Sequence, residues 1–218
     1  GWTGAFTQPF NFGYFRPVVS LSFQADRALF GTNTFLYHQT NLIIHLVTVL
    51  LVVFLAKRLT RSRGAALASG LFFGIQPIQA STVSWIGGRT DSLCALFLTA
   101  FLLLLVIGVS ATKRKAWILV ASAFALLLAM FCKEQSALAF LLVPPVYVLS
   151  TEKYQRTLRS WTATLAPFAL ACYVFFVLWV VSSLGMIAAE PHTLSEQLAL
   201  GGRGLWHYTL LMLAPSPS

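Results

Sequence analysis

Long apolar runs separated by short basic connectors make up most of this chain. A bilayer is crossed by about 20 apolar residues in a helix, or by fewer where flanking side chains reach the interface. The apolar positions are continuous rather than alternating, which favours helices over strands. The pattern therefore predicts an all-α, polytopic transmembrane bundle with about six or seven spans. The nearly uncharged runs are Leu42–Ala56, Leu93–Val109, Ala116–Phe131, Leu138–Leu149 and Ala163–Leu184.

We interpret residues 1–218 as a single membrane domain that is a fragment of a larger protein. Residues 1–40 are expected to form an outer loop and an interfacial helix. Residues 41–184 would hold six spans, and 185–218 an outer segment and the start of a further span. The expected spans are Asn41–Ala56, Ala65–Gln79, Leu93–Ser110, Ala116–Phe131, Ala137–Leu149 and Trp161–Leu184.

Three of these segments carry local signals. An amphipathic helix is predicted after Pro17, with Val18, Leu21, Ala25 and Leu29 at helical spacing and Gly31 at its end. Small residues in the run that begins at Ala65 favour close helix packing. A bend is predicted at Pro144-Pro145.

The charges divide the chain into two faces. Only 10% of the residues are charged, whereas a soluble domain has roughly 25%. Ten basic residues and one acid fall in the connectors Lys57–Arg63, Lys113–Lys115 and Glu152–Arg159. This distribution is typical of cytoplasmic loops, so the net charge of +9 does not indicate nucleic-acid binding.

The opposite, outer face is expected to carry five basic residues and five acids. Mixed charge at a membrane face suits a site for a charged substrate, although solvated loops would look the same. The stretch from Pro77 to Asp91 lies on this face and turns at Gly87-Gly88. Within it, Trp85 suits the membrane–water boundary.

Five residues on the outer face are candidates for binding a substrate or a lipid phosphate: Arg16, Arg89, Asp91, Lys133 and Glu134. Arg16 could hold a phosphate with its planar fork or serve as an interfacial anchor. Arg89 and Asp91 could hold a ligand or pair with each other in a turn. Lys133 could neutralise a phosphate while Glu134 takes a sugar hydroxyl, or the two could form a self-satisfied pair at a helix end.

Cysteine and histidine give no metal or redox motif. Cys94, Cys132 and Cys172 lie in or at the ends of apolar runs, with no C-x-x-C, and are expected to be buried thiols. His38 and His45 are seven apart, which places them near one helical face without a third ligand. We expect them to hydrogen-bond neighbouring helices.

Four stretches in fixed order carry a family resemblance. They are F-R-P-V-V-S-L-S-F-Q-A-D-R from Phe15, Y-H-Q-T-N from Tyr37, P-I-Q-A-S-T-V-S-W-I-G-G-R-T-D from Pro77, and C-K-E-Q-S-A from Cys132. Together they resemble the membrane part of the TMTC-type (transmembrane and tetratricopeptide repeat-containing) proteins. Those proteins belong to the GT-C class of glycosyltransferases, with the protein O-mannosyltransferases. The resemblance covers most of residues 12–145.

The resemblance implies an enzyme of the bacterial inner membrane or endoplasmic reticulum. Such an enzyme moves a hexose from a polyprenyl-phosphate carrier to an acceptor protein or glycan on the periplasmic or lumenal face. Its partners would be that sugar donor, the bilayer and the acceptor, with no nucleic acid, and a divalent metal is a possible cofactor. The family's catalytic acid would lie upstream of Gly1, so no catalytic residue is assigned in this chain.

The chain departs from the family pattern at one place. Where relatives usually read H-P-x-H-x-E, it has Gln76, Pro77, Gln79 and Ser81. Amides and a hydroxyl replace two imidazoles and a carboxylate, so a catalytically silent relative is an alternative. A non-enzymatic polyprenyl-lipid-binding protein or a transporter is another, although a transporter would show inverted repeats or charges at the midplane.

Overall fold

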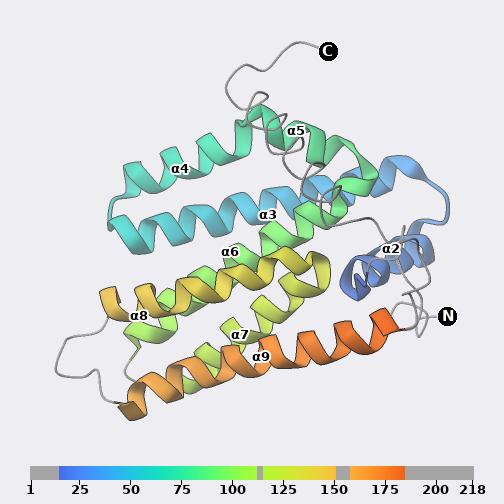
Figure 1. The fold of residues 1–218 in the computed structure, drawn as a ribbon. Coiled ribbons are helices and arrows are strands. Elements are labelled where there is room, and N and C mark those ends of the chain that lie inside the picture. Colours follow the sequence, from blue (N-terminus) through green and yellow to red (C-terminus); the bar gives the residue numbers. More distant parts are fainter. Residues whose placement is uncertain (1–14, 112–114, 151–157, 185–218) are drawn as a thin grey trace, which may run out of the picture. The chain divides into compact units, whose positions relative to one another are not determined.

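The computed structural model describes residues 15–111, 115–150 and 158–184, and nearly all of these are helical (Figure 1). The chain divides into two units, Gly1–Ser183 and Leu184–Ser218. The described helices lie in the first unit, apart from the final residue of the last one. The predicted outer segment over 185–218 lies outside the described residues. The elements are α2 (Pro17–Phe30), α3 (Thr34–Thr60), α4 (Arg63–Ile75), α5 (Pro77–Ser84), the 3-10 turn η1 (Ile86–Gly88), α6 (Arg89–Ser110), α7 (Lys115–Cys132), the 3-10 helix η2 (Glu134–Leu142), α8 (Val143–Ser150) and α9 (Leu158–Leu184).

Four stretches of helix are long and apolar enough to cross a membrane, among the residues described: Thr34–Thr60, Ile86–Ser110, Lys115–Cys132 and Trp161–Val180. Arg63–Ile75 and Glu134–Leu149 are shorter apolar helical stretches. The predicted all-α, polytopic membrane fold is therefore confirmed, and the protein is an integral membrane protein. The count of six or seven spans stays a prediction.

The helix α2 begins and ends where the sequence indicates. Pro17 occupies its first turn, and Gly31 follows its last residue with φ +62°, a conformation that favours glycine. The Gly31 N–H donates to the Arg27 carbonyl at 3.0 Å. Pro17, Val19 and Asp26 are the residues that this helix buries, whereas Leu29 is 74% exposed. The bundle-facing side of α2 is thus not its most apolar stripe.

Two other predicted segments are divided differently. The segment expected as one span over Ala65–Gln79 is not one continuous helix, because α4 ends at Ile75, Gln76 is extended and α5 starts at Pro77. Proline has no N–H to donate within a helix and suits a first turn, so it separates the two helices. Pro144 and Pro145 lie in the first turn of α8, which follows η2 directly at Val143, and the bend expected there stays a prediction.

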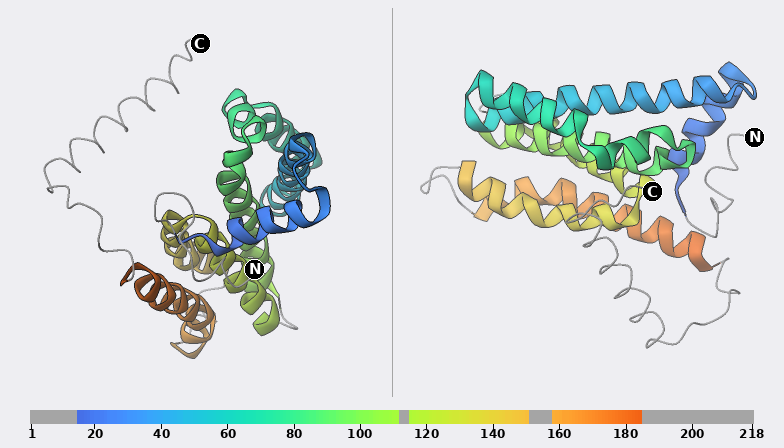
Figure 2. Two further views of the ribbon diagram at one scale, coloured as in Figure 1. Left: turned by 90° about the vertical axis from the view of Figure 1, so that its right-hand side faces the viewer. Right: turned by 90° about the horizontal axis from the view of Figure 1, so that it is seen from above.

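Helices α3 and α4 pack closely because small residues line their contact (Figures 1 and 2). Ala66 and Gly70 are buried, and a Cβ on Gly70 would lie 2.2 Å from a Val53 methyl. His45 of α3 lies 3.2 Å from the Gly74 carbonyl through Nε2, and its ring stacks on Phe73. The predictions of close packing and of an interhelical His45 contact are confirmed.

The main apolar core lies where α6 and α7 pack on each other and on α8 and α9. Its most deeply buried members are Phe101, Leu105, Leu126, Met130, Val143, Tyr147 and Phe168. Helices α3 and α6 run parallel, because residues near their starts contact each other and residues near their ends line one cavity. The starts of α3 and α6 and the end of α7 therefore lie at one end of the bundle, and the ends of α3, α6 and α8 lie at the other.

Candidate functional site

The four sequence stretches that carry the family resemblance meet at the end of the bundle where α3 and α6 start. Three of them contribute six charged side chains, which we call the charged cluster: Arg16, Asp26, Arg89, Asp91, Lys133 and Glu134. Arg16 is the residue before α2, Asp26 lies in α2, and Arg89 and Asp91 lie in the first turn of α6. Lys133 and Glu134 join α7 to η2. The cluster contains every acidic residue in the described ranges.

The inner layer of the cluster is centred on Arg89, whose side chain is fully buried. Its Nη2 lies 2.7 Å from Asp26 Oδ2 and donates to the Tyr37 carbonyl at 3.0 Å. Its Nε donates to Asn41 Oδ1. The guanidinium carbon lies 4.7 Å from the centre of the Phe23 ring, close enough for a cation–π contact. A buried arginine needs such partners, because an unpaired charge in this environment is very costly.

Polar residues of α3 complete the inner layer. Asn41 is fully buried and donates through Nδ2 to the Trp85 carbonyl at 3.0 Å. Thr40 donates through Oγ1 to Asp26 Oδ1 at 3.2 Å. These contacts connect α2, α3 and the turn before α6, so the inner layer fixes the positions of these three elements relative to one another.

The outer layer consists of two ion pairs that remain partly accessible. Lys133 Nζ lies 2.5 Å from Asp91 Oδ1, with 34% of the Lys133 side chain and 49% of the Asp91 side chain exposed. Arg16 Nη2 lies 3.4 Å from both oxygens of Glu134, with exposures of 15% and 33%. Partly solvated pairs of this kind are weak, about 0–1 kcal/mol, so their partners can exchange.

The turn before α6 separates the two layers. A Cβ on Gly88 would lie 2.1 Å from the Thr82 carbonyl oxygen, so the backbones of α5 and η1 approach each other more closely than a side chain allows. The helix that starts here directs Arg89 into the bundle and leaves Asp91 exposed. Trp85, just before the turn, is 69% exposed.

Four of the five predicted site residues come together in the outer layer, and the fifth lies in the inner one. Arg89 and Asp91 do not pair with each other, because successive helical positions point in different directions: Arg89 pairs with Asp26 and Asp91 with Lys133. Likewise, Glu134 pairs with Arg16 and not with Lys133. The self-contained turn pair and helix-end pair considered from the sequence are therefore wrong.

Sequence reasoning missed Asp26 and Asn41. Both lie inside stretches that carry the resemblance, and an acid on an interfacial helix was the available signal. Their partners are too distant in sequence for local spacing to reveal. Over the ranges that the structure describes, no group of three His, Cys, Asp or Glu side chains is placed to hold a metal ion. Cys94 and Cys132 are free and buried, and Cys172 is free and partly buried.

The outer layer can exchange one anion for another. Arg16 and Lys133 present cationic donors that are now held by carboxylates, and a phosphate group would compete for the same donors. A phosphate bound there would release Asp91 and Glu134, which could then accept hydrogen bonds from hydroxyl groups. The arrangement therefore suits a ligand that combines a phosphate with a sugar.

Comparison with known families agrees with this chemistry. The model of the dolichyl-phosphate-mannose-protein mannosyltransferase family matches residues 16–180, which begins at Arg16 and includes the whole charged cluster. The chain belongs to this family. The predicted relationship to GT-C glycosyltransferases and TMTC-type proteins is thus confirmed.

Three curated relatives show where the similarity lies. Protein O-mannosyl-transferase TMTC1 of Mus musculus is 41% identical over 90 residues, 40% of this chain and 10% of that protein. Protein O-mannosyl-transferase Tmtc1 of Drosophila melanogaster is 32% identical over 139 residues, 63% of this chain and 16% of that protein. Protein O-mannosyl-transferase TMTC2 of Mus musculus is 30% identical over 102 residues, 47% of this chain and 12% of that protein. The chain thus aligns with only a small part of each relative. No solved structure matches the chain.

Proposed function

We propose that this chain forms part of a membrane glycosyltransferase that moves mannose from a polyprenyl-phosphate carrier to a hydroxyl group, such as that of a protein serine or threonine. The observation that carries the proposal is the convergence of three separate sequence stretches on two partly accessible ion pairs, with the fourth stretch contacting Arg89 beneath them. The family match over residues 16–180 supports mannose as the sugar.

Arg16 and Lys133 would contact the carrier phosphate. Arginine can make two parallel hydrogen bonds to a phosphate, and lysine acts as a point charge beside it. Cations in these positions would also stabilise the negative charge that grows on the phosphate as the sugar leaves. Asp91 and Glu134, released from their present partners, would accept hydrogen bonds from sugar or acceptor hydroxyls.

Arg89 would support the site from beneath. Its contacts with Asp26 and Asn41 fix the start of α6, from which Asp91 projects. Preorganised groups lose less free energy on binding than mobile ones, so this inner layer would keep the outer pairs in reach of one ligand. In this proposal Arg89 is a positioning residue.

The site would face the periplasm or the lumen. Its end of the bundle carries balanced charge, whereas the other end carries the basic residues that typically face the cytoplasm. The sugar carrier would then meet the site from the outer leaflet, in the bacterial inner membrane or the endoplasmic reticulum.

The test is sugar transfer from a labelled polyprenyl-phosphate mannose by the purified full-length protein in detergent. Lys133→Ala should lower the rate about tenfold to a hundredfold, because it removes a charge-assisted contact of about 1.5–3 kcal/mol made in the transition state. Gln76→Ala is the matched control and should change the rate much less, since an amide is neither an acid nor a base near neutral pH. Equal and negligible losses in both variants would remove Lys133 from the site.

A second candidate is a silent relative that binds the carrier without transferring the sugar. It is favoured by Gln76, Gln79 and Ser81, which stand where the family resemblance implies two histidines and a glutamate. For this candidate, the folded wild-type protein would show no transfer, yet it would bind the polyprenyl phosphate, and Lys133→Ala would weaken that binding.

A further inference from the structure

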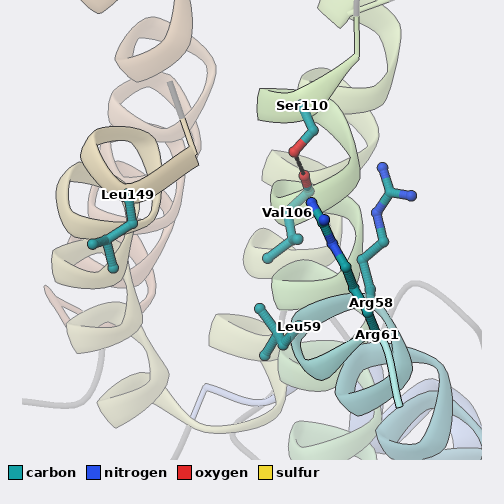
Figure 3. Close-up of a pocket in the computed structure, with 6 residues that line it drawn as sticks. All are labelled: Arg58, Leu59, Arg61, Val106, Ser110 and Leu149. Atoms are coloured by element: carbon teal, nitrogen blue, oxygen red, sulfur yellow. Dashed lines mark hydrogen bonds between the residues drawn. The ribbon is translucent and has the colours of Figure 1, made fainter. Parts of the chain in front are cut away.

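The end of the bundle opposite the charged cluster contains a cavity of about 510 Å³. It lies where α3, α6 and α8 end, and it is lined by Arg58, Leu59, Arg61, Val106, Ser110 and Leu149 (Figure 3). Figure 3 shows the two arginine side chains beside Val106 and Ser110, with Leu149 across the opening. The cavity therefore combines two guanidinium groups with apolar walls at the point where apolar helices end.

Nothing in the described structure neutralises these two arginines. Both are exposed, and the three acids of the described ranges all belong to the charged cluster at the other end. Arg58 and Arg61 are three residues apart near the end of one helix, so their like charges repel each other. An anion held between them would relieve this repulsion.

The backbone conformation of Arg61 also supports an anion site in this cavity. Arg61 directly follows α3 in the left-handed conformation, with φ 57° and ψ 8°, and its N–H donates to the Lys57 carbonyl at 3.0 Å. Glycine is the usual residue at this position of a helix terminus, because a side chain there costs free energy. An arginine at a place where glycine would be more stable suggests that its side chain is used.

We propose that this cavity binds the phosphate-bearing headgroup of an anionic phospholipid. Arg58 and Arg61 would contact the phosphate, and the acyl chains would run along the apolar side chains of Leu59 and Leu149. Basic pockets between membrane helices commonly bind anionic headgroups. The site is independent of the proposed sugar transfer and lies at the end of the bundle facing the other leaflet.

The experiment is native mass spectrometry of the full-length protein in detergent, titrated with dioleoyl phosphatidylserine. The variant Arg58→Gln/Arg61→Gln should weaken binding about thirtyfold, since each contact contributes roughly fivefold. The matched control is Lys57→Gln/Arg63→Gln, which removes the same charge from the residues flanking Arg58 and Arg61, and neither position lines the cavity. It should weaken binding no more than about threefold. Equal losses in the two double variants would overturn the proposal, because they would indicate general attraction to a basic surface.

Three further measurements complete the test. Arg61→Gly should keep or raise the thermal stability while weakening phosphatidylserine binding, which separates a loss of the site from a loss of folding. Dioleoyl phosphatidylcholine should bind far more weakly than phosphatidylserine, and equal binding would contradict a site for anionic lipid. Inorganic phosphate should fail to displace the lipid at millimolar concentration; displacement would show a site for free phosphate instead.

Discussion

Arg89 of α6 and Asp26 of α2 form an ion pair of 2.7 Å that is almost completely excluded from solvent. The pair fastens the first described helix to the start of a membrane-spanning one. It also explains why α2 faces the bundle with an acid rather than with its most apolar stripe. Together with the packing of the Phe15 ring on Phe131 of α7, this pair holds Arg16, just before α2, close to Glu134.

Breaking the pair should destabilise the protein strongly. Asp26→Ala is expected to lower the free energy of unfolding by about 3–5 kcal/mol, because it leaves the Arg89 charge buried without its counter-ion. Arg27→Ala, at an exposed position of the same helix, should change it by no more than about 0.5 kcal/mol. Unfolding in mixed detergent–SDS micelles measures both. A similar small effect for the two variants would show that Arg89 finds other compensation.

Gly88 should tolerate no side chain. In Gly88→Ala the new Cβ would meet the Thr82 carbonyl at 2.1 Å, and backbone cannot move aside as a flexible side chain can. We expect a loss of at least about 1–3 kcal/mol in the free energy of unfolding, with weaker coupling between α5 and α6. Gly64→Ala is the control: the nearest atom to its Cβ is 4.0 Å away, and alanine should stabilise the helix by up to about 1 kcal/mol. In one series of unfolding measurements, Gly88→Ala should have a lower unfolding midpoint than Gly64→Ala, and the reverse order would contradict the prediction.

The fold was predictable as far as local signals reach. Pro17 and Gly31 define α2 because both act through their own backbone, and the apolar runs identify the spans because a bilayer requires them. Whether each apolar run forms one continuous helix was harder to predict. The composition around Gln76 stays apolar enough for one span, yet Pro77 interrupts the helix. We identified no sequence feature that predicts the 3-10 geometry of Glu134–Leu142.

The residues that belong to the site could be predicted, but the ion pairs between them could not. Charged residues inside otherwise apolar stretches identified Arg16, Arg89, Asp91, Lys133 and Glu134. Their partners depend on how α2, α6 and α7 pack, which sequence spacing does not determine. Asn41 illustrates the difficulty, because a single amide near the start of an apolar helix is indistinguishable from a surface residue until Arg89 and Trp85 are placed beside it.

The two ends of the bundle should face opposite sides of the membrane. In sealed vesicles that expose the cytoplasmic side, a cysteine introduced as Ser62→Cys at the basic end should react at once with an impermeant thiol reagent. A cysteine introduced as Asn33→Cys, just before α3 at the other end, should react only after detergent is added. Both are compared with the wild-type protein, whose Cys94 and Cys132 are buried. Immediate labelling of Asn33→Cys would reverse the proposed orientation.

Exchanging the two charges of the outer pair separates a structural role from a functional one. Asp91 and Lys133 are both partly exposed, so either single substitution should change the free energy of unfolding by no more than about 1 kcal/mol. The double variant Asp91→Lys/Lys133→Asp restores an ion pair between the same positions. If the pair served only stability, the exchange would restore the activity of the full-length protein as well. We expect otherwise: the thermal midpoint should return to the wild-type value, while transfer or carrier binding stays at least about tenfold reduced, because the cation no longer lies where the phosphate meets Arg16. Recovery of both properties would assign Lys133 to structure alone.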